Sequence, residues 1–413
     1  MTYGEILPDG TIIDLASPSE GGLELILFDG KQSLILPQVE HGGFTYAPAY
    51  LDPSVLRAIW FPTGLSEYGT TSTLFTKVES LFSRHLGLAE DSAAFLTAWV
   101  FGSWLPEYFP APPTLCVFAA SRAAARRLFR VLSPLGRRSL PVAELSPRLP
   151  ISGLRPTLLV NDPKLSARSC ASWQAANDHD VYVAARRGAL CNLASAKAVF
   201  CGPGDAADSW GDDAMRLQLP PVVDEFPLLS YQAQAQISAE FQPQLERYRL
   251  VHLGPMPQSG SAPCPAEFAN FELARNLFAC LPDVPALTQK VAPLLECQQQ
   301  ELAARRSLDP RVAIVEVLWK PAHEAREISS SEVTERVNAI LLARGEFYEY
   351  NSREVGWKLR QLGLSRHSTG ECKVLQFTSE IRRRIHQLAR EFGLNLPRVE
   401  ACPDCGGREK IDE

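Results

Sequence analysis

The sequence of 413 residues predicts an α/β protein with a mostly parallel sheet flanked by helices, a small β-rich region before it and a compact helical unit after it. Short apolar runs alternate with helical stretches over 113–223, which is typical of parallel strands covered on both faces. The runs lie at 114–118, 139–145, 156–162, 180–185, 196–202 and 215–221. Apolar residues make up 46% of the chain and charged residues 21%, so the chain can bury sizeable cores. A length of this order allows two to four domains.

Composition and turn signals divide the chain into consecutive segments. The first pairs apolar, β-branched runs with Asp-Gly and Gly-Gly turns, which favours a small β region. The second is helical and holds an uncharged run over 92–106; this is shorter than the roughly 18 residues of a membrane-spanning helix, so we expect a buried helix. The expected segments are a β-rich region (1–50), a helical segment (51–112), an α/β domain (113–223), a helical linker region (224–305), a compact C-terminal domain (306–396) and a polar tail (397–413).

The C-terminal domain follows the order helix, helix, helix, hairpin and helix. Ser330, Ser331 and Ser352 sit where N-caps are expected, and Thr369 with Gly370 marks the hairpin turn. This is the order of a winged helix, a variant of the helix-turn-helix that places its third helix in the major groove of DNA.

Charge in the C-terminal domain favours a phosphate-bearing partner. The net charge of the chain is −6, but 353–390 holds nine Lys or Arg against three Glu. We expect Trp357 and Leu359 to pack inward. The predicted nucleic-acid contacts are Arg353, Lys358, Arg360, Arg366, His367, Lys373, Arg382, Arg383 and Arg384. A winged helix that contacts only proteins is the alternative.

The first strand and helix of the α/β domain occupy the place of a phosphate-binding loop. When the template G-x-x-x-x-G-K-[ST] is laid on this segment, its glycines fall on Ala119 and Ala124, its lysine on Ala125 and its hydroxyl on Arg126. The apolar framing residues fit the template, but every residue that would bind phosphate or Mg²⁺ is absent.

A second nucleotide motif is degenerate in the same way. The apolar run over 156–160 should end in Asp-Glu, which hold the metal and orient water, but it ends in Asn161 and Asp162. Asn is a poorer partner for Mg²⁺, and Asp is one methylene shorter than Glu.

Together these features resemble the ATPase module of phage and plasmid primase–helicases, a P-loop fold near the AAA+ and superfamily-3 helicases. The resemblance covers about residues 90–395 and includes the uncharged helix and Pro-rich loop before the phosphate loop and the winged helix after the module. It implies a P-loop NTPase-like sheet, a DNA partner and a mobile-element origin.

The departures from that family predict a non-catalytic protein for which ATP and Mg²⁺ are not cofactors. Arg122, Arg126 and Arg130 share one helix face and, with Arg137 and Arg138, could bind nucleic-acid phosphates instead. The alternatives are an ATPase that uses Arg126 and Asp162, a protein-interaction scaffold, and an unrelated α/β sheet that fits the template by chance.

Ten scattered cysteines and the lack of a signal peptide favour reduced thiols in the cytoplasm. Cys402 and Cys405 form a C-x-x-C pair with the spacing of half a zinc site, so zinc is the one cofactor that we consider possible. Cys372 and His386 are the nearest further ligands in the sequence, and a second chain is another source. Protein partners and a membrane contact are not indicated.

Overall fold

The computed structural model describes most of the chain in two compact units, 1–297 and 298–413. The described residues are 1–18, 22–146, 152–162, 164–184, 190–202, 210, 214–221, 226–253, 264–265, 268, 272–284, 286–324, 327–364, 367–369, 372–399 and 402–405. The boundary between the units falls within helix α8 (Leu287–Ser307). Each unit is described by itself.

The first unit opens with an antiparallel β region. Strands β1 (Glu5–Ile6), β2 (Ile12–Ala16), β3 (Glu24–Phe28) and β4 (Ser33–Leu36) pair in sequence order, and β5 (Val39–His41) forms a hairpin with β6 (Phe44–Tyr46). Every residue of β2 is buried, because the sheet shares one apolar core with the α/β part of the unit. The N-terminal segment is therefore β-structured, as its turn signals indicate.

Three helices follow, and the third is central to the unit. They are α1 (Pro53–Ala58), α2 (Thr71–Leu86) and α3 (Glu90–Trp104), followed by the 3-10 turn η1 (Pro106–Tyr108). Residues 93–104 of α3 are all buried, and its indoles donate to backbone oxygens: Trp99 Nε1 to Pro113 at 3.3 Å and Trp104 Nε1 to Leu135 at 2.8 Å. The uncharged run is thus a buried helix, as expected. No helix in the described part of the chain has the length and hydropathy needed to cross a membrane.

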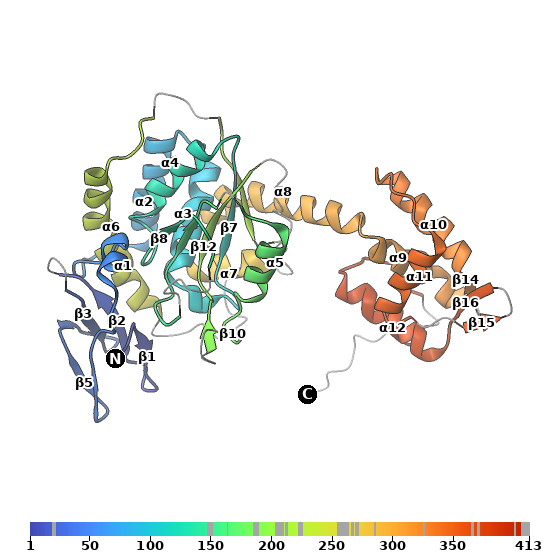
Figure 1. The fold of residues 1–413 in the computed structure, drawn as a ribbon, viewed down its shortest axis with the longest axis horizontal. Helices are drawn as coiled ribbons and strands as arrows, with labels where there is room; N and C mark the ends of the chain where they lie inside the picture. Colours follow the sequence, from blue (N-terminus) through green and yellow to red (C-terminus); the bar gives the residue numbers. More distant parts are fainter. Residues whose placement is uncertain are drawn as a thin grey trace. The chain divides into compact units, whose positions relative to one another are not determined.

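The centre of the first unit is a five-stranded parallel sheet (Figure 1). Its spatial order is β13-β7-β12-β9-β8, and all four pairings are parallel. The strands are β7 (Thr114–Phe118), β8 (Leu140–Val142), β9 (Leu158–Val160), β12 (Lys197–Cys201) and β13 (Met215–Gln218). The mostly parallel α/β sheet that the apolar runs indicate is confirmed.

One expected strand lies outside this sheet. The run over 180–185 gives β10 (Tyr182–Ala184), which pairs antiparallel with β11 (Leu190–Asn192) as a separate two-stranded sheet. Its residues are exposed or half-buried, whereas β12 is buried throughout. The run therefore lacks the burial on both faces of a central parallel strand.

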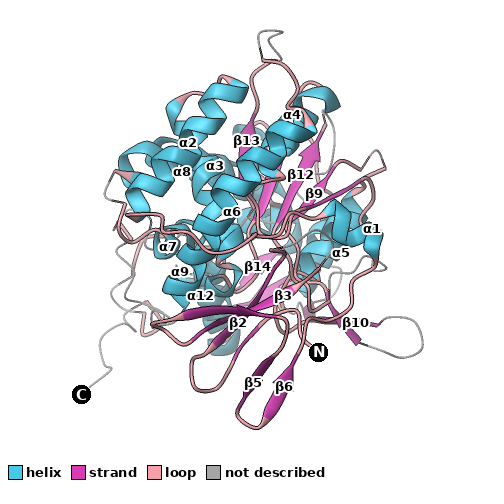
Figure 2. Ribbon diagram, turned by 90° about the vertical axis from the view of Figure 1, so that its left-hand side faces the viewer, coloured by secondary structure: helices cyan, strands magenta, loops and turns pink. Residues whose placement is uncertain are grey.

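Helices complete the first unit (Figure 2). Residues of α5 (Ala167–Ala175) and of the N-terminal β region join one core with Cys116, Val160 and Val199 of the parallel sheet. Helix α4 (Arg122–Leu132) packs against β12 and α2. The remaining helices are α6 (Tyr231–Leu253), α7 (Glu272–Cys280) and the first part of α8.

The second unit is built on the apolar faces of its helices and a three-stranded sheet. Its helices are α9 (Pro310–Glu324), α10 (Ser330–Ala343), α11 (Ser352–Gln361) and α12 (Ser379–Glu391). Strands β14 (Glu327–Ser329), β15 (His367–Thr369) and β16 (Cys372–Gln376) pair antiparallel in the order β14-β16-β15. The expected hairpin is β15 and β16, while β14 is an additional strand.

Caps define the helix starts of this unit. The N-cap of α10 is Ser329 rather than Ser330 or Ser331, and its side chain accepts from Glu332 N at 3.2 Å. The N-cap of α11 is Asn351 rather than the expected Ser352, and it forms a capping box with Glu354. These caps stabilise the two helices that a helix-turn-helix would use.

Candidate functional site

The parallel sheet has one position where α/β proteins commonly bind ligands. The connection from β7 leads to β8 at one edge, and the connection from its neighbour β12 leads to β13 at the other edge. Connections that leave adjacent strands in opposite directions open a crevice beyond the carboxyl ends of the strands. The segments predicted as a degenerate phosphate loop and metal-binding strand lie at this end of the sheet.

The loop after β7 is too short to form a phosphate cradle. Only residues 119–121 separate β7 from α4. Ala124 and Ala125, the template positions of the second glycine and the lysine, are therefore already helical, and their backbone N–H groups donate to Ser121. A wide loop with free N–H groups, which the template requires, is replaced by an ordinary capped helix start.

Arg122 extends from this helix start across the neighbouring strand ends. Its Nη1 donates to the side-chain oxygen of Asn161 at 2.9 Å and to the Asn161 carbonyl at 3.4 Å, and its Nη2 donates to the Asp162 carbonyl at 3.2 Å. The guanidinium also lies 5.0 Å from the centre of the Phe200 ring on β12. A cation of the protein itself thus occupies the end of the sheet between β9 and β12.

The two residues in the predicted metal-binding positions have other partners. The Asn161 side chain accepts from Arg122, and the Asp162 carboxylate accepts from Lys164 N at 2.7 Å. Asp162 is buried. Its local role is to hold the turn after β9, as Asx turns do.

Space beside the first turn of α4 is small. A cavity of about 40 Å³ borders Ala124 and Arg127, whereas ligand pockets usually measure about 300–1,000 Å³. Arg126 points to solvent, and Arg130 Nη1 donates to the Leu229 carbonyl at 2.7 Å. In the described contacts it is Arg122, not Arg126, that reaches Asn161 and Asp162 after β9.

The prediction that Arg137 and Arg138 contact nucleic acid is wrong. Both are buried, and both donate to Asp14 of β2, Arg137 at 2.9 Å. Arg249 donates to the same carboxylate through Nε at 2.9 Å and to the Glu107 carboxylate through Nη1 and Nη2. Burial opposes ionisation of Asp14, but the three guanidiniums outweigh it and hold its pKa well below the usual range. These arginines join the N-terminal strands to the α/β part.

The second unit brings part of the predicted interface together on α11. Arg353, Trp357 and Arg360 follow one another at helical spacings of four and three residues, and all three are exposed. Trp357 is 54% exposed, so its predicted inward packing is wrong, whereas Leu359 is fully buried as expected. Lys358 is half-buried, with its ammonium 5.2 Å from the centre of the Tyr350 ring.

The other predicted contacts differ in their availability. Lys373 on β16 and Arg383 on α12 are exposed. Arg384 is half-buried, and its guanidinium donates to the Leu362 carbonyl after α11 at 3.0 Å and to Glu391 at 3.1 Å. Arg382 is half-buried as well. Arg366 and the side chain of His367 lie outside the described residues.

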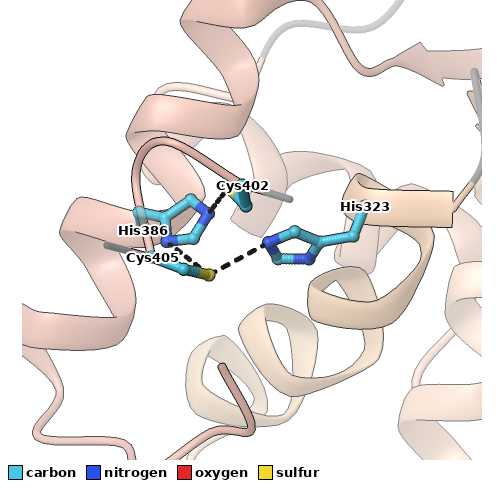
Figure 3. Close-up of side chains that lie close together, drawn as sticks. All are labelled: His323, His386, Cys402 and Cys405. Carbon is cyan, nitrogen blue, oxygen red and sulfur yellow. Dashed lines mark hydrogen bonds between the residues drawn. The ribbon is translucent and has the colours of Figure 1, made fainter. Parts of the chain in front are cut away.

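Two histidines join the C-x-x-C pair in the second unit (Figure 3). The four possible ligand atoms of His323, His386, Cys402 and Cys405 all lie within 4.8 Å of one another. Cys402 Sγ is 3.4 Å from His386 Nε2, and Cys405 Sγ is 3.4 Å from His323 Nε2. His386 was among the nearest ligands expected from the sequence, whereas the side chain of Cys372, the other one, lies outside the described residues.

Sequence reasoning missed His323. It stands 79 positions before Cys402 and has no partner at metal-binding spacing, because it lies on α9 while the cysteines lie in the tail after α12. The sequence feature that could have pointed to His323 is Trp319, an aromatic residue one helical turn before it. The indole lies 5.0 Å from the His323 ring and 4.4 Å from the His386 ring.

Two solved structures are similar to this chain at low sequence identity. No family model and no curated protein matches the chain. Two solved structures, both described as the apo A form of the C-terminal region of NrS-1, align with 88% of this chain and 96% of the NrS-1 chain at 10% identity. Their TM-scores are 0.37 and 0.35, and values this low do not establish a common fold.

Proposed function

We propose that this protein binds DNA through the second unit and that its parallel-sheet unit is a non-catalytic relative of primase–helicase ATPase modules. The observation that carries the first part is the exposed face of α11, on which Trp357 stands between Arg353 and Arg360. Three helices followed by a hairpin support a winged helix with α11 as its recognition helix.

The chemistry of this face suits a nucleic acid. Arginines provide contacts to phosphates and guanine edges, and an exposed aromatic ring adds stacking or contact with thymine methyl groups. Arg353 lies in the first turn of α11, where a cation opposes the helix dipole unless an anion is near. Lys373 on β16 and Arg383 on α12 are further exposed cations of the unit.

The occupied crevice supports the second part of the proposal. A nucleotide at the carboxyl end of the sheet would have to displace Arg122 from three hydrogen bonds. At the template positions it would meet Ala125 in place of the lysine, a three-residue loop in place of the phosphate cradle, and Asn161 with Asp162 in place of the acidic pair. We therefore expect no Mg²⁺-dependent ATP hydrolysis by the full chain.

Binding of a random-sequence duplex of about 25 base pairs by the full chain tests the DNA role. We expect Trp357→Ala to weaken binding about tenfold, and Arg353→Ala and Arg360→Ala each to reduce the slope of log K against log salt by about one. Leu342→Ala and Arg336→Ala on α10 are matched controls, because both side chains are exposed.

Three results would each overturn a part of the proposal. Equal binding by Trp357→Ala and Leu342→Ala would remove α11 from the interface. Absence of salt-dependent binding by the wild-type chain would favour a protein-interaction scaffold. Mg²⁺-dependent ATP turnover that disappears in Asp162→Ala would instead support an ATPase with atypical motifs.

A further inference from the structure

We propose that His323, His386, Cys402 and Cys405 form a structural zinc site that attaches the C-terminal tail to α9 and α12. The four residues come from three separate parts of the second unit: the last turn of α9, the middle of α12 and the turn at 402–405. Only the C-x-x-C pair is local in the sequence, so the fold of the unit brings the two histidines to it.

The distances fit a tetrahedral ion. Zinc lies about 2.3 Å from thiolate sulfur and about 2.0–2.1 Å from imidazole nitrogen, so a sulfur and a nitrogen of one tetrahedron are about 3.6 Å apart. The Cys402–His386 and Cys405–His323 pairs are both separated by 3.4 Å. All four ligand atoms lie within 4.8 Å of one another, so binding would draw the wider pairs of the set about 1 Å closer.

The donor set selects the metal class. Two thiolates and two neutral imidazoles favour Zn²⁺ over Mg²⁺ or Ca²⁺, which prefer oxygen. A Rieske [2Fe–2S] cluster also uses two Cys and two His, but its cysteines and histidines bind different irons, whereas here each sulfur lies 3.4 Å from a histidine nitrogen, as around a single ion. Four protein ligands leave no open position for water, which is typical of a structural rather than a catalytic zinc ion.

Contacts around the set already orient the ligands. His323 Nδ1 lies 2.7 Å from the carbonyl oxygen of Trp319, and this hydrogen bond directs Nε2 to Cys405. His386 is buried, and the Trp319 ring packs edge-on against it. Metal-bound histidines in proteins commonly have such a carbonyl partner on their second nitrogen.

The tail is held beside the helices by bonds that do not involve the metal. Trp319 Nε1 donates to the Pro397 carbonyl at 2.9 Å, and Arg390 Nη2 donates to the Asp404 carbonyl at 3.1 Å. Cys405 N donates to the Cys402 carbonyl at 3.2 Å, which closes the turn that presents both sulfurs to the same side. A bound ion would add a direct link from the turn at 402–405 to α9 and α12.

The test is the metal content of the full chain, purified under reducing conditions without chelator or affinity metal. We expect one zinc per chain, and loss of at least nine-tenths of it in Cys405→Ser and in His323→Ala. Cys297→Ser is the matched control, because Cys297 is an exposed cysteine outside the set. Co²⁺ added to the metal-free wild type should give the visible absorption of tetrahedral thiolate coordination.

Circular dichroism of each variant separates loss of metal from loss of fold, and zinc titration of the chelator-treated wild type provides a measurement without mutation. The proposal is overturned if the wild type takes up less than a tenth of an equivalent of zinc while Cys402 and Cys405 are both reduced. Full zinc retention in both variants overturns it as well. If the protein is reduced, then exposed to air, and forms a Cys402–Cys405 disulfide with no zinc bound, the pair belongs to redox chemistry instead.

Discussion

Single residues in the first unit carry unusual electrostatic costs, and Lys197 is the simplest example. It is fully buried at the start of β12, where its ammonium donates to the side chain of Asn177 and to the Ser195 carbonyl at 2.7 Å. Neither partner is a carboxylate. Burial therefore lowers the pKa of Lys197 to about 7.

This shift predicts a measurable pH dependence of stability. The unfolded lysine has a pKa of about 10.4, so between pH 7 and 10 the unfolded chain binds more protons and the wild type becomes more stable as the pH rises. Compared with Lys197→Met, the wild type should gain about 2–3 kcal/mol between pH 7 and 9.5. Urea unfolding of both proteins at several pH values measures this gain. Parallel pH profiles would show that Lys197 stays charged when buried.

Residue-level predictions from the sequence failed where charge is buried or an aromatic ring is exposed. Arg137 and Arg138 looked like a cationic patch, because the sequence does not reveal that Asp14, 123 positions earlier, lies against them. Trp357 was assigned to the core on hydrophobicity alone. Both errors arise from long-range packing, which local pattern does not encode.

Among the elements, the start of α4 decides what the sheet can bind. The helix begins at Arg122 because Ser121 caps it, and this early start places the guanidinium against the strand ends. Apolar runs in the sequence indicated β7, α4, β9, β12 and β13. They could not indicate the spatial order of the strands or the separate pairing of β10 with β11, since both depend on chain reversal and burial.

Removing the guanidinium tests its structural role. Arg122→Met leaves the Asn161 side chain and two carbonyls without this donor, so we expect the free energy of unfolding to fall by about 1–3 kcal/mol. ATP with Mg²⁺ should raise the melting temperature of neither the wild type nor the variant. Arg126→Met, on an exposed position of the same helix, is the control and should be near neutral. Equal stability of both variants would contradict a bridging role.

At the scale of the whole molecule, the two units have separate cores. The first depends on the buried ion cluster at Asp14, and the second gathers the Cys and His ligands. The sequence indicated the compact C-terminal helical unit through its helix order and caps, but the full ligand set required the fold, since His323 lies on a different helix from His386.

Separate cores predict separate unfolding transitions in calorimetry of the full chain. Asp14→Asn should destabilise the first unit by about 3–5 kcal/mol, because three buried guanidiniums lose their shared carboxylate. A zinc chelator should lower the midpoint temperature of the second unit's transition and leave that of the first unit unchanged. One transition that responds to both treatments would show that the units unfold together.

The arginine at the end of the parallel sheet has a consequence for how such a protein can act. An enzyme that hydrolyses nucleotide can act repeatedly, because each round of hydrolysis returns it to its starting state. The non-catalytic role proposed above would leave this chain without such a reset. With the proposed DNA binding, its effect would then scale with the number of copies bound, as expected for a repressor or an accessory subunit rather than for a motor.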